Sequence, residues 1–549
     1  MMSKQRVVRS HSPFAWLKWA AIGIALLLAL PVLVVVANVF TGSGGVWTHL
    51  WNTVLADYVS NSLLLMIGVA VGVLCIGVPV AWLTSVCRFP GASVLGWALL
   101  LPLAMPAYII AYTYTGLLDF AGPVQGAIRA LSGLGYGEYW FFEIRSLGGA
   151  VIMLSLVLYP YVYLMSRAAF LEQSANTLEV SRTLGYSNVS AFFRLALPLA
   201  RPAIIAGLTL AMMEVLADYG TVQYFGVATF TTGIMRTFYG FGDLAGASQL
   251  AGILLLFVCV LIFTERYSRR KLRYHASGLR KVSQRELVLS GWRGVAACVF
   301  CCLPVLFGFL LPAGVLLYWS VFEAEPLTWD FLLLAWHSFY LAFLAALIVV
   351  ALALVLSYAL RLHPSRSVSA SVASAGVGYA LPGTIIAIGV IVPLAWLDHR
   401  LINLVKDVSG DKIGLVFSGT IIALLFAYAV RFMAVSLGAV QSGLGKIKPS
   451  MDMAGRSLGL TPLQVLKRVH FPLLKGSVLT ALLIVFVDVL KELPATLILR
   501  PFNFNTLAVR AFELASDERL VDAAPASIMI VLVGLIPVVL LNRSISKHH

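Results

Sequence analysis

The chain has 549 residues, of which 60% are apolar and only 11% are charged, and its mean hydropathy is +0.92. Soluble domains carry roughly 25% charged residues, so this composition excludes a water-soluble globule. The net charge of +15 is compatible with nucleic-acid binding, but the basic residues lie between apolar runs and form no basic face with interleaved aromatic residues. We therefore expect a membrane protein that binds no nucleic acid.

Long apolar runs recur along the chain, each long enough to cross about 30 Å of hydrocarbon as a helix of roughly 20 residues. The runs are continuous and do not alternate with polar residues, which excludes a transmembrane barrel. We therefore predict an all-α polytopic membrane protein with about 12 spans. The predicted spans cover residues 16–40, 60–84, 94–118, 147–169, 201–225 and 245–265 in the first half, and 295–321, 336–360, 372–397, 414–436, 476–499 and 522–542 in the second.

Basic residues predict the orientation of these spans. Lys4, Arg6 and Arg9 precede the first run, which is too long for a cleaved signal peptide, so we expect an uncleaved anchor. Short loops rich in Lys and Arg stay on the cytoplasmic side. With the N-terminus in the cytoplasm, alternation places most Lys and Arg on that side and the C-terminus there as well.

The sequence contains an internal repeat. The segments Gly185–Pro198 and Gly459–Pro472 share the same Gly-to-Pro spacing, and their residue numbers differ by a constant offset of 274. The segment Met105-Pro-Ala-Tyr-Ile-Ile-Ala111 matches Leu381-Pro-Gly-Thr-Ile-Ile-Ala387 at an offset of 276. A repeat at a nearly constant offset predicts two copies of one structural unit. We expect two parallel six-span repeats, residues 1–285 and 286–549, joined by a basic linker near 266–293.

Each repeat carries one such loop between its fourth and fifth spans, on the predicted cytoplasmic side. We call residues 178–198 and 452–472 the first and second coupling loops. They begin Leu178-Glu-Val-Ser-Arg-Thr-Leu-Gly185 and Asp452-Met-Ala-Gly-Arg-Ser-Leu-Gly459, and end Leu195-Ala-Leu-Pro198 and Val469-His-Phe-Pro472. A helix that ends at glycine can turn through positive φ, and a proline suits the first turn of a new helix.

These loops resemble the EAA motif of ABC importer permeases. The resemblance implies the type I permease fold and a short coupling helix, which sits in a cleft of an ATP-hydrolysing subunit. Glu179 keeps the acidic residue of the motif in the first loop. In the second loop Met453 takes that position and the adjacent Asp452 is acidic. We take Glu179, Gly185, Pro198, Asp452, Gly459 and Pro472 as the candidate coupling residues.

The chain shows no nucleotide site of its own. Gly445-Lys446 is followed by Ile447, where a phosphate-binding loop needs Ser or Thr to hold magnesium. We therefore expect no catalytic residue and no cofactor in this chain, with ATP and magnesium held by the partner ATPase.

Ionisable residues inside predicted spans are costly and therefore candidates for function. Glu214 and Asp218 lie four residues apart, which places them on one face of a continuous helix. The second repeat offers Asp488, Lys491 and Glu492 at the matching place. They are candidates for the translocation path or its gate, and internal salt bridges such as Lys491 with Asp488 are the alternative.

Two further pairs follow at the offset of 274, on the predicted outer side. Arg236 matches Arg510, and Asp243 matches Asp517. These residues are candidates for contact with a delivering protein, and a plain solvated loop is the alternative.

Four sequence segments around these residues make the family resemblance more specific. The segments Glu214–Gly226, Phe230–Gly233, Lys491–Thr496 and Arg500–Asn503 resemble fused ferric-iron importer permeases over nearly the whole chain. This implies a bacterial inner membrane, a periplasmic iron-binding protein, two copies of an ABC ATPase and one permease chain per complex. No His or carboxylate cluster with metal-ligand spacing lies in the spans, so we predict no resident metal site.

Other functions remain open from the sequence. A related permease could carry thiamine, a polyamine or an inorganic anion. An ion-coupled secondary transporter also fits twelve spans, but it gives the paired coupling loops no role. A membrane-embedded enzyme would need a catalytic cluster, which we do not find.

Overall fold

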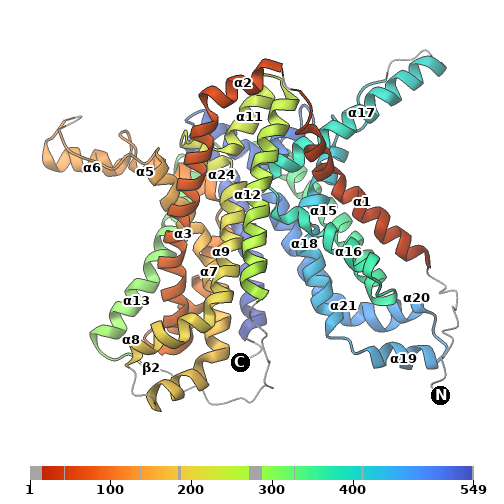
Figure 1. The fold of residues 1–549 in the computed structure, drawn as a ribbon. Coiled ribbons are helices and arrows are strands. Elements are labelled where there is room, and N and C mark those ends of the chain that lie inside the picture. The colour runs from red at the N-terminus through yellow and green to blue at the C-terminus, as the bar shows by residue number, and fades with distance from the viewer. Residues whose placement is uncertain are drawn as a thin grey trace. The chain divides into compact units, whose positions relative to one another are not determined.

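The computed structural model describes residues 15–42, 44–135, 138–183, 187–270, 287–326, 328–409 and 413–546. Within these residues the chain is almost entirely helical (Figure 1). The described strands are β1 (Cys87–Arg88) and β2 (Leu287–Val288), a short parallel pair in which Cys87 lies opposite Leu287. The prediction of an all-α polytopic protein is confirmed. The predicted linker and the predicted repeat boundary at 285 fall mostly or wholly outside the described residues.

The helices of the first repeat follow the order of the predicted spans. They are α1 (Ala15–Asn38), α2 (Gly44–Thr53), α3 (Leu55–Val86), α4 (Ala92–Ala98), the 3-10 turn η1 (Leu101–Ala104), α5 (Ala107–Leu118), α6 (Pro123–Ser132), α7 (Leu147–Thr183), α8 (Asn188–Ala191), the π-helical η2 (Phe192–Ala196), α9 (Leu197–Ala217), α10 (Gly220–Tyr224), α11 (Phe230–Gly240) and α12 (Leu244–Arg270).

The second repeat follows nearly the same order. Its helices are α13 (Trp292–Val305), η3 (Leu306–Leu310), α14 (Leu311–Tyr318), η4 (Trp319–Glu323), α15 (Trp329–Leu362), α16 (Arg366–Ala375), η5 (Val377–Ala380), α17 (Gly383–Ser409), α18 (Ile421–Gly445), α19 (Pro449–Ser457), α20 (Pro462–Val465), η6 (Leu466–His470), α21 (Phe471–Leu490), α22 (Pro494–Leu499), α23 (Leu507–Ser516) and α24 (Leu520–Ser546).

Eleven described helices are long and apolar enough to span a membrane, and a bent pair brings the number to twelve. The predicted third span, 94–118, is not one straight helix. Residues Ala92–Ala104 and Ala107–Ser132 meet at an angle of 91°. The bend lies at Met105-Pro106, where Met105 is extended, because proline lacks the N–H that would continue the helix and disfavours the helical conformation before it. Leu381-Pro382 separates η5 from α17 at the same place in the second repeat.

The helices pack into two compact units that do not coincide with the two halves of the sequence. Unit 1 contains residues 1–34, 340–380 and 389–489, and unit 2 contains residues 35–339, 381–388 and 490–549. Most of α1 therefore packs with second-repeat helices, and α13 and α14 pack with first-repeat helices. In unit 2, for example, a side chain at Gly308 would lie 2.7 Å from the Leu156 carbonyl oxygen. Each unit thus draws helices from both repeats.

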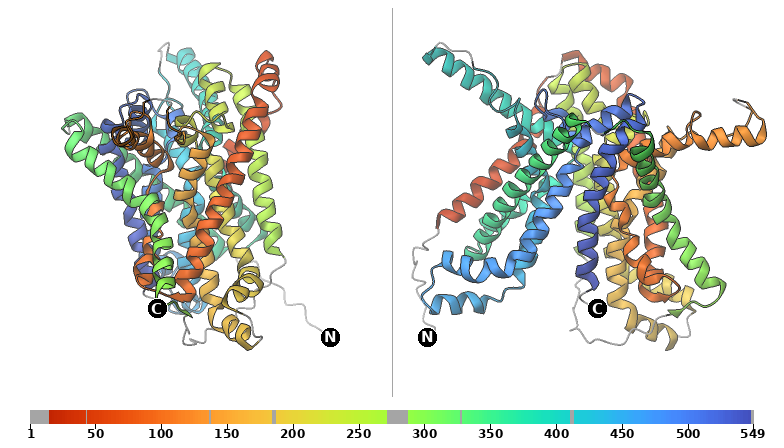
Figure 2. Two further views of the ribbon diagram at one scale, coloured as in Figure 1. Left: turned by 90° about the vertical axis from the view of Figure 1, so that its left-hand side faces the viewer. Right: turned by 180° about the vertical axis from the view of Figure 1, so that it is seen from behind.

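Within unit 2, helices α3, α7, α9 and α12 run side by side (Figure 1). The segment η2 lies at one end of α9, and α10 follows its other end. Helix α6, labelled in Figure 1, projects away from the other helices of this unit, as the view from behind also shows (Figure 2, right).

Candidate functional site

The second coupling loop is a helix, a sharp turn and a second helix. After α18 ends at Gly445, α19 runs from Pro449 to Ser457 and the chain then turns at Gly459, whose φ is +79°. This left-handed conformation is the one expected for a glycine after a helix. Next come α20, η6 and α21. The order helix, glycine turn and helix is the local structure that the sequence predicts for this loop.

Each coupling loop joins its span through a π-helical turn. The turns are η2 (Phe192–Ala196) and η6 (Leu466–His470), which again match at the offset of 274. Leu197 N–H bonds the carbonyl of Phe192, and Phe471 N–H bonds that of Leu466. Pro198 and Pro472 come directly afterwards. A proline removes one backbone donor and crowds the carbonyl four residues earlier, and a wider turn relieves both problems.

The prediction that these prolines restart a helix is wrong. The helical run already begins at Asn188 in the first repeat and at Pro462 in the second, so each proline lies inside a continuous helical segment. The fifth candidate span consequently covers Phe192–Ala217 instead of 201–225, and the eleventh covers Leu466–Leu490 instead of 476–499.

Asp452 of the second loop is bound inside unit 1. The Arg361 guanidinium, at the end of α15, donates from Nε and Nη2 to the Asp452 carboxylate, with N···O distances of 2.9 and 3.1 Å. It also donates to the carbonyls of Leu444 and Ile447 at the end of α18, at 2.9 and 3.0 Å. The Arg361 side chain therefore links α19 to α15, on which it lies, and to the end of α18.

His470 of η6 completes this cluster. Its Nε2 lies 2.6 Å from Asp452 Oδ1, and its side chain is 1% exposed. Burial of Asp452 opposes ionisation, but the hydrogen bonds from Arg361 and His470 outweigh it and lower the pKa of this carboxyl. We call Arg361, Asp452 and His470 the anchor cluster. Asp452 is thus bound within the loop's own unit, and its role in coupling to the ATPase stays a prediction.

Two apolar side chains of the second loop are exposed, Met453 by 62% and Leu458 by 82%. Polar residues such as Ser457 and Thr461 are exposed beside them. In the first loop, Glu179 lies in the last turns of α7 but its side chain is outside the described residues, as is Gly185 altogether.

Asp218 does not lie on the same helix face as Glu214. Helix α9 ends at Ala217, and Asp218 is extended with ψ of 131°. Its carboxylate accepts hydrogen bonds from the Thr221 hydroxyl at 2.9 Å and the Val222 N–H at 3.1 Å. It therefore caps the short helix α10. The prediction of a shared face is wrong because the helix ends one residue too early.

Glu492 has the same structural role in the second repeat. It is 5% exposed and follows the end of α21. Its carboxylate accepts from the Ala495 and Thr496 N–H groups at 3.0 and 2.9 Å and from the Thr496 hydroxyl at 2.6 Å. Both carboxylates thus satisfy the first N–H groups of a short helix. A path or gate role for Asp218, Glu492, Glu214, Asp488 or Lys491 stays a prediction.

The outer helices α11 and α23 are capped alike. Thr229 and Thr506 are their N-caps, and the next N–H donates to Ser62 Oγ in the first repeat and to Ser338 Oγ in the second. The offset between these two caps is 277. From Glu492 to Thr506 the second repeat has three residues more than the first repeat has from Asp218 to Thr229. The offset of 274 therefore no longer holds here.

The predicted pairing of the outer charges is therefore wrong. Arg236 lies seven residues after its N-cap, whereas Arg510 lies four residues after its own. Asp243 accepts hydrogen bonds from the N–H groups of Ala245 and Gly246 and caps α12. Asp517 lies at the C-terminal end of α23 and is exposed. Contact of these residues with a delivering protein stays a prediction.

An ion pair joins the two repeats within unit 2. Arg145, just before α7, donates from both Nη atoms to the Glu518 carboxylate, at 2.8 Å each. Asp119 lies 3.4 Å away, and the Arg145 guanidinium lies 5.2 Å from the Tyr224 ring centre. The hydrogen bonds from Arg145 lower the pKa of Glu518.

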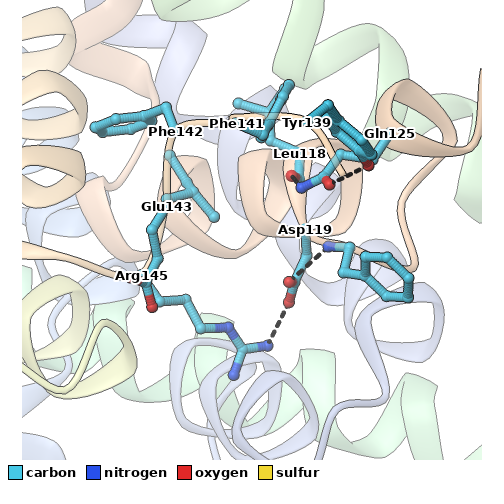
Figure 3. Close-up of a pocket in the computed structure, with 10 residues that line it drawn as sticks. Leu118, Asp119, Gln125, Tyr139, Phe141, Phe142, Glu143 and Arg145 are labelled. Carbon is cyan, nitrogen blue, oxygen red and sulfur yellow. Dashed lines mark hydrogen bonds and ion pairs between the residues drawn. The ribbon is translucent and has the colours of Figure 1, made fainter. Parts of the chain in front are cut away.

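Arg145 and Asp119 also line a pocket of about 330 Å³. Figure 3 shows the Arg145 side chain directed at Asp119, with Gln125 and Tyr139 on the far side of Leu118. The pocket joins the end of α5 to the segment that leads into α7. Among the described residues, no group of three or more His, Cys, Asp or Glu could hold a metal ion.

Sequence reasoning missed the anchor cluster and the Arg145–Glu518 pair. Arg361 lies 91 residues from Asp452, and Arg145 lies 373 residues from Glu518. No local pattern could reveal either contact. The one available signal was Asp452, which lies one position before Met453, the residue at the place of the motif's glutamate.

Similarity to known proteins covers nearly the whole chain. An Fe(3+)-transport system permease protein, FbpB 2, from Haemophilus influenzae is 26% identical over 538 residues, which is 97% of this chain and 98% of that protein. The chain resembles a double-length ABC permease throughout. A ferric transport system permease protein FbpB from Actinobacillus pleuropneumoniae is 24% identical over 73% of this chain and 58% of its own length.

A shorter relative matches only part of the chain. The molybdenum transport system permease protein ModB from Haemophilus influenzae is 29% identical over 33% of this chain, which is 77% of that protein. This match is shorter than either of the two repeats. No family model matches the chain.

Proposed function

We propose that this chain is the permease subunit of an ATP-driven importer and forms the translocation path for ferric iron. The observation that carries the transport role is the pair of coupling loops, each with a π-helical turn and a proline at the same place in its repeat. Ferric iron as the cargo is supported by the similarity to two ferric permeases, one of them along almost the entire chain.

The partners follow from this role. Two copies of an ABC ATPase subunit dock on the two coupling loops, and they hold ATP and magnesium. A periplasmic binding protein delivers the cargo to the opposite end of the spans. One permease chain then suffices for each complex because it carries both loops. The chain itself has no enzymatic role and no cofactor, and it resides in a bacterial inner membrane with both termini in the cytoplasm.

Docking of the ATPase subunits can be tested by mutating Gly185 and Gly459 in the two coupling loops. Gly459 has positive φ, a conformation that proline cannot adopt. We expect the combined variant Gly185→Pro and Gly459→Pro to lose ATP-dependent uptake while the ATPase itself still hydrolyses ATP. Gly459→Asn is the matched control, because asparagine tolerates positive φ. Uptake that persists in the double proline variant would show that these loops do not transmit the energy.

The cargo is tested with the reconstituted complex. A ferric-binding protein loaded with iron should stimulate ATP hydrolysis, and a molybdate-binding protein should not. The second candidate is an inorganic anion such as molybdate, because ModB is 29% identical over the part that it matches. Stimulation by the molybdate-binding protein alone would replace the iron proposal and leave the permease role intact.

A further inference from the structure

Helix α6 and the segment after it project from unit 2 (Figure 2). The helix covers Pro123–Ser132, and none of its residues is buried. Its chain comes from α5, which ends at Leu118, and returns to α7, which begins at Leu147. The projecting helix is therefore joined to a membrane-spanning helix at the end opposite the first coupling loop.

The polar side of α6 faces the two segments that enter and leave the helix. Gln125 donates to the Leu118 carbonyl at 2.9 Å and accepts from the Tyr139 hydroxyl at 2.7 Å. Arg129, one turn later, donates to the Phe120 carbonyl at 2.9 Å, and its guanidinium lies 4.2 Å from the Phe120 ring centre. Both polar side chains are occupied by the chain that enters and leaves the helix.

The apolar side of α6 faces outward. Val124, Ala127 and Leu131 recur at spacings of three and four residues, which places them on one helical stripe. All three are exposed, Leu131 by 90%. Trp140 in the returning segment is 87% exposed. A helix on a water-facing surface shows the opposite arrangement, with its apolar stripe toward the protein.

The end of α17 repeats this arrangement within unit 1. Asp398 has no exposed surface, and its carboxylate accepts from the N–H groups of Val416, Phe417 and Ser418 in the returning segment, at 2.9, 2.9 and 2.7 Å. Leu404 and Val408 are 61% and 80% exposed. These apolar side chains lie beside the exposed Lys406 and Asp407, so the surface of this end of α17 is amphipathic.

We propose that α6 and the part of α17 beyond Pro393 lie in the lipid interface of the leaflet opposite the coupling loops. The exposed apolar side chains enter the boundary between headgroups and acyl chains, as in amphipathic interfacial helices. Aromatic side chains are enriched at both membrane interfaces, and Arg can anchor a helix at the interface together with them. Arg129 stacks on Phe120, and the Arg400 guanidinium lies 5.3 Å from the Trp396 ring centre.

Charge favours lipid over a protein partner as the occupant. Arg129 is the one charged residue of α6, and it is already bound to Phe120 and Tyr139. A protein interface has a polar rim around its apolar centre, whereas the polar residue exposed beside the stripe of α6, Ser132, is small and uncharged. Attachment to a membrane-spanning helix supplies the lipid contact without any further binding step. The proposal does not depend on the cargo.

The test uses spin labels on the full-length chain in lipid nanodiscs. After the six native cysteines are replaced, single cysteines are placed at Leu131 and at its neighbour Ser132, and likewise at Leu404 and Asn403. We expect labels at 131 and 404 to be several-fold more accessible to oxygen than to a water-soluble nickel reagent. The matched labels at 132 and 403 should show the reverse.

A second measurement needs no cysteine replacement. The difference in tryptophan fluorescence between the wild-type chain and Trp140→Phe gives the signal of Trp140. Bilayers that contain lipids brominated near the headgroup should quench this signal. Nickel accessibility at 131 and 404 equal to that of the controls, or an unquenched Trp140 signal, would overturn the proposal. So would labels that stay exposed to water until a binding protein covers them, because that result would identify a protein docking surface.

Discussion

The two coupling loops are attached to the protein in different ways. In the first repeat α7 runs without a break from Leu147 to Thr183, so the loop continues its span. In the second repeat α18 ends at Gly445, and α19 begins as a separate helix at Pro449. The anchor cluster holds this separate helix in place.

The sequence shows that the cluster belongs to the second repeat alone. At the offset of 274, Asp452 corresponds to Leu178 and His470 corresponds to Ala196. At the offset of 276, which holds earlier in each repeat, Arg361 corresponds to Ser85. All three members are absent from the first repeat together. The separate helix of the second loop is thus held by side chains from three elements, and the first repeat has none of these three residues at the matching positions.

The largest effect should come from removing the carboxylate of the anchor cluster. Asp452→Ala leaves the largely buried Arg361 without its charged partner, and breaking such a pair costs about 3 kcal/mol. Leu178→Ala at the matching place removes no charged partner and serves as the comparison variant. The measurement is thermal unfolding followed by tryptophan fluorescence, because Trp396 lies in the same unit as the anchor cluster, together with ATPase stimulation. Equal losses in the two variants would remove the proposed asymmetry between the loops.

The helix caps should behave alike in both repeats. Asp218→Asn and Glu492→Gln each weaken hydrogen bonds from backbone N–H groups and a threonine hydroxyl, and we expect each to cost about 2 kcal/mol. Uptake should fall only as far as the amount of folded protein falls. If one variant keeps its stability but loses uptake, that carboxylate acts in the translocation path, and the repeats differ there too.

A smaller effect is expected at the glycine turn. Gly459→Ala must hold alanine at positive φ, which costs about 1 kcal/mol, and no neighbouring atom lies in the way of the new methyl group. Gly459→Asn should cost less. The same two changes at Gly185 test whether the first loop uses the same turn. A stable Gly185→Ala beside a destabilised Gly459→Ala would mean that only the second loop turns through positive φ.

The smallest effect is expected for the ion pair of Arg145 and Glu518, which is more exposed than the anchor cluster. Glu518 pairs with Arg145 as Asp452 pairs with Arg361, but its side chain is 62% exposed. Glu518→Gln should therefore cost less than about 1 kcal/mol. Because the folded pKa of Glu518 is lowered, its contribution is present above the unfolded value of about 4.3 and is lost as the pH falls through the lower folded value. The difference in Tm from wild type should be constant above pH 5 and shrink in acid, whereas a difference that grows in acid would contradict the pairing.

Much of the architecture could be predicted because it depends on local chemistry. Apolar runs long enough to span a membrane predicted the helices, and the Gly-to-Pro spacing predicted two equivalent loops. The turn at Gly459 followed from the backbone freedom of glycine. The bend at Pro106 was not predicted, although Met105-Pro106 is local, because the apolar run continues through it.

By itself, then, the sequence determined the membrane class, the helical content, the repeat and the place of the coupling loops, since each of these depends on neighbouring residues. The tertiary structure decided what the charged residues do. Whether Asp452 is free or bound depends on Arg361, a residue 91 positions away, and whether Asp218 lines a helix face depends on where α9 ends. Such contacts arise only when distant segments pack, so no spacing along the chain could have revealed them.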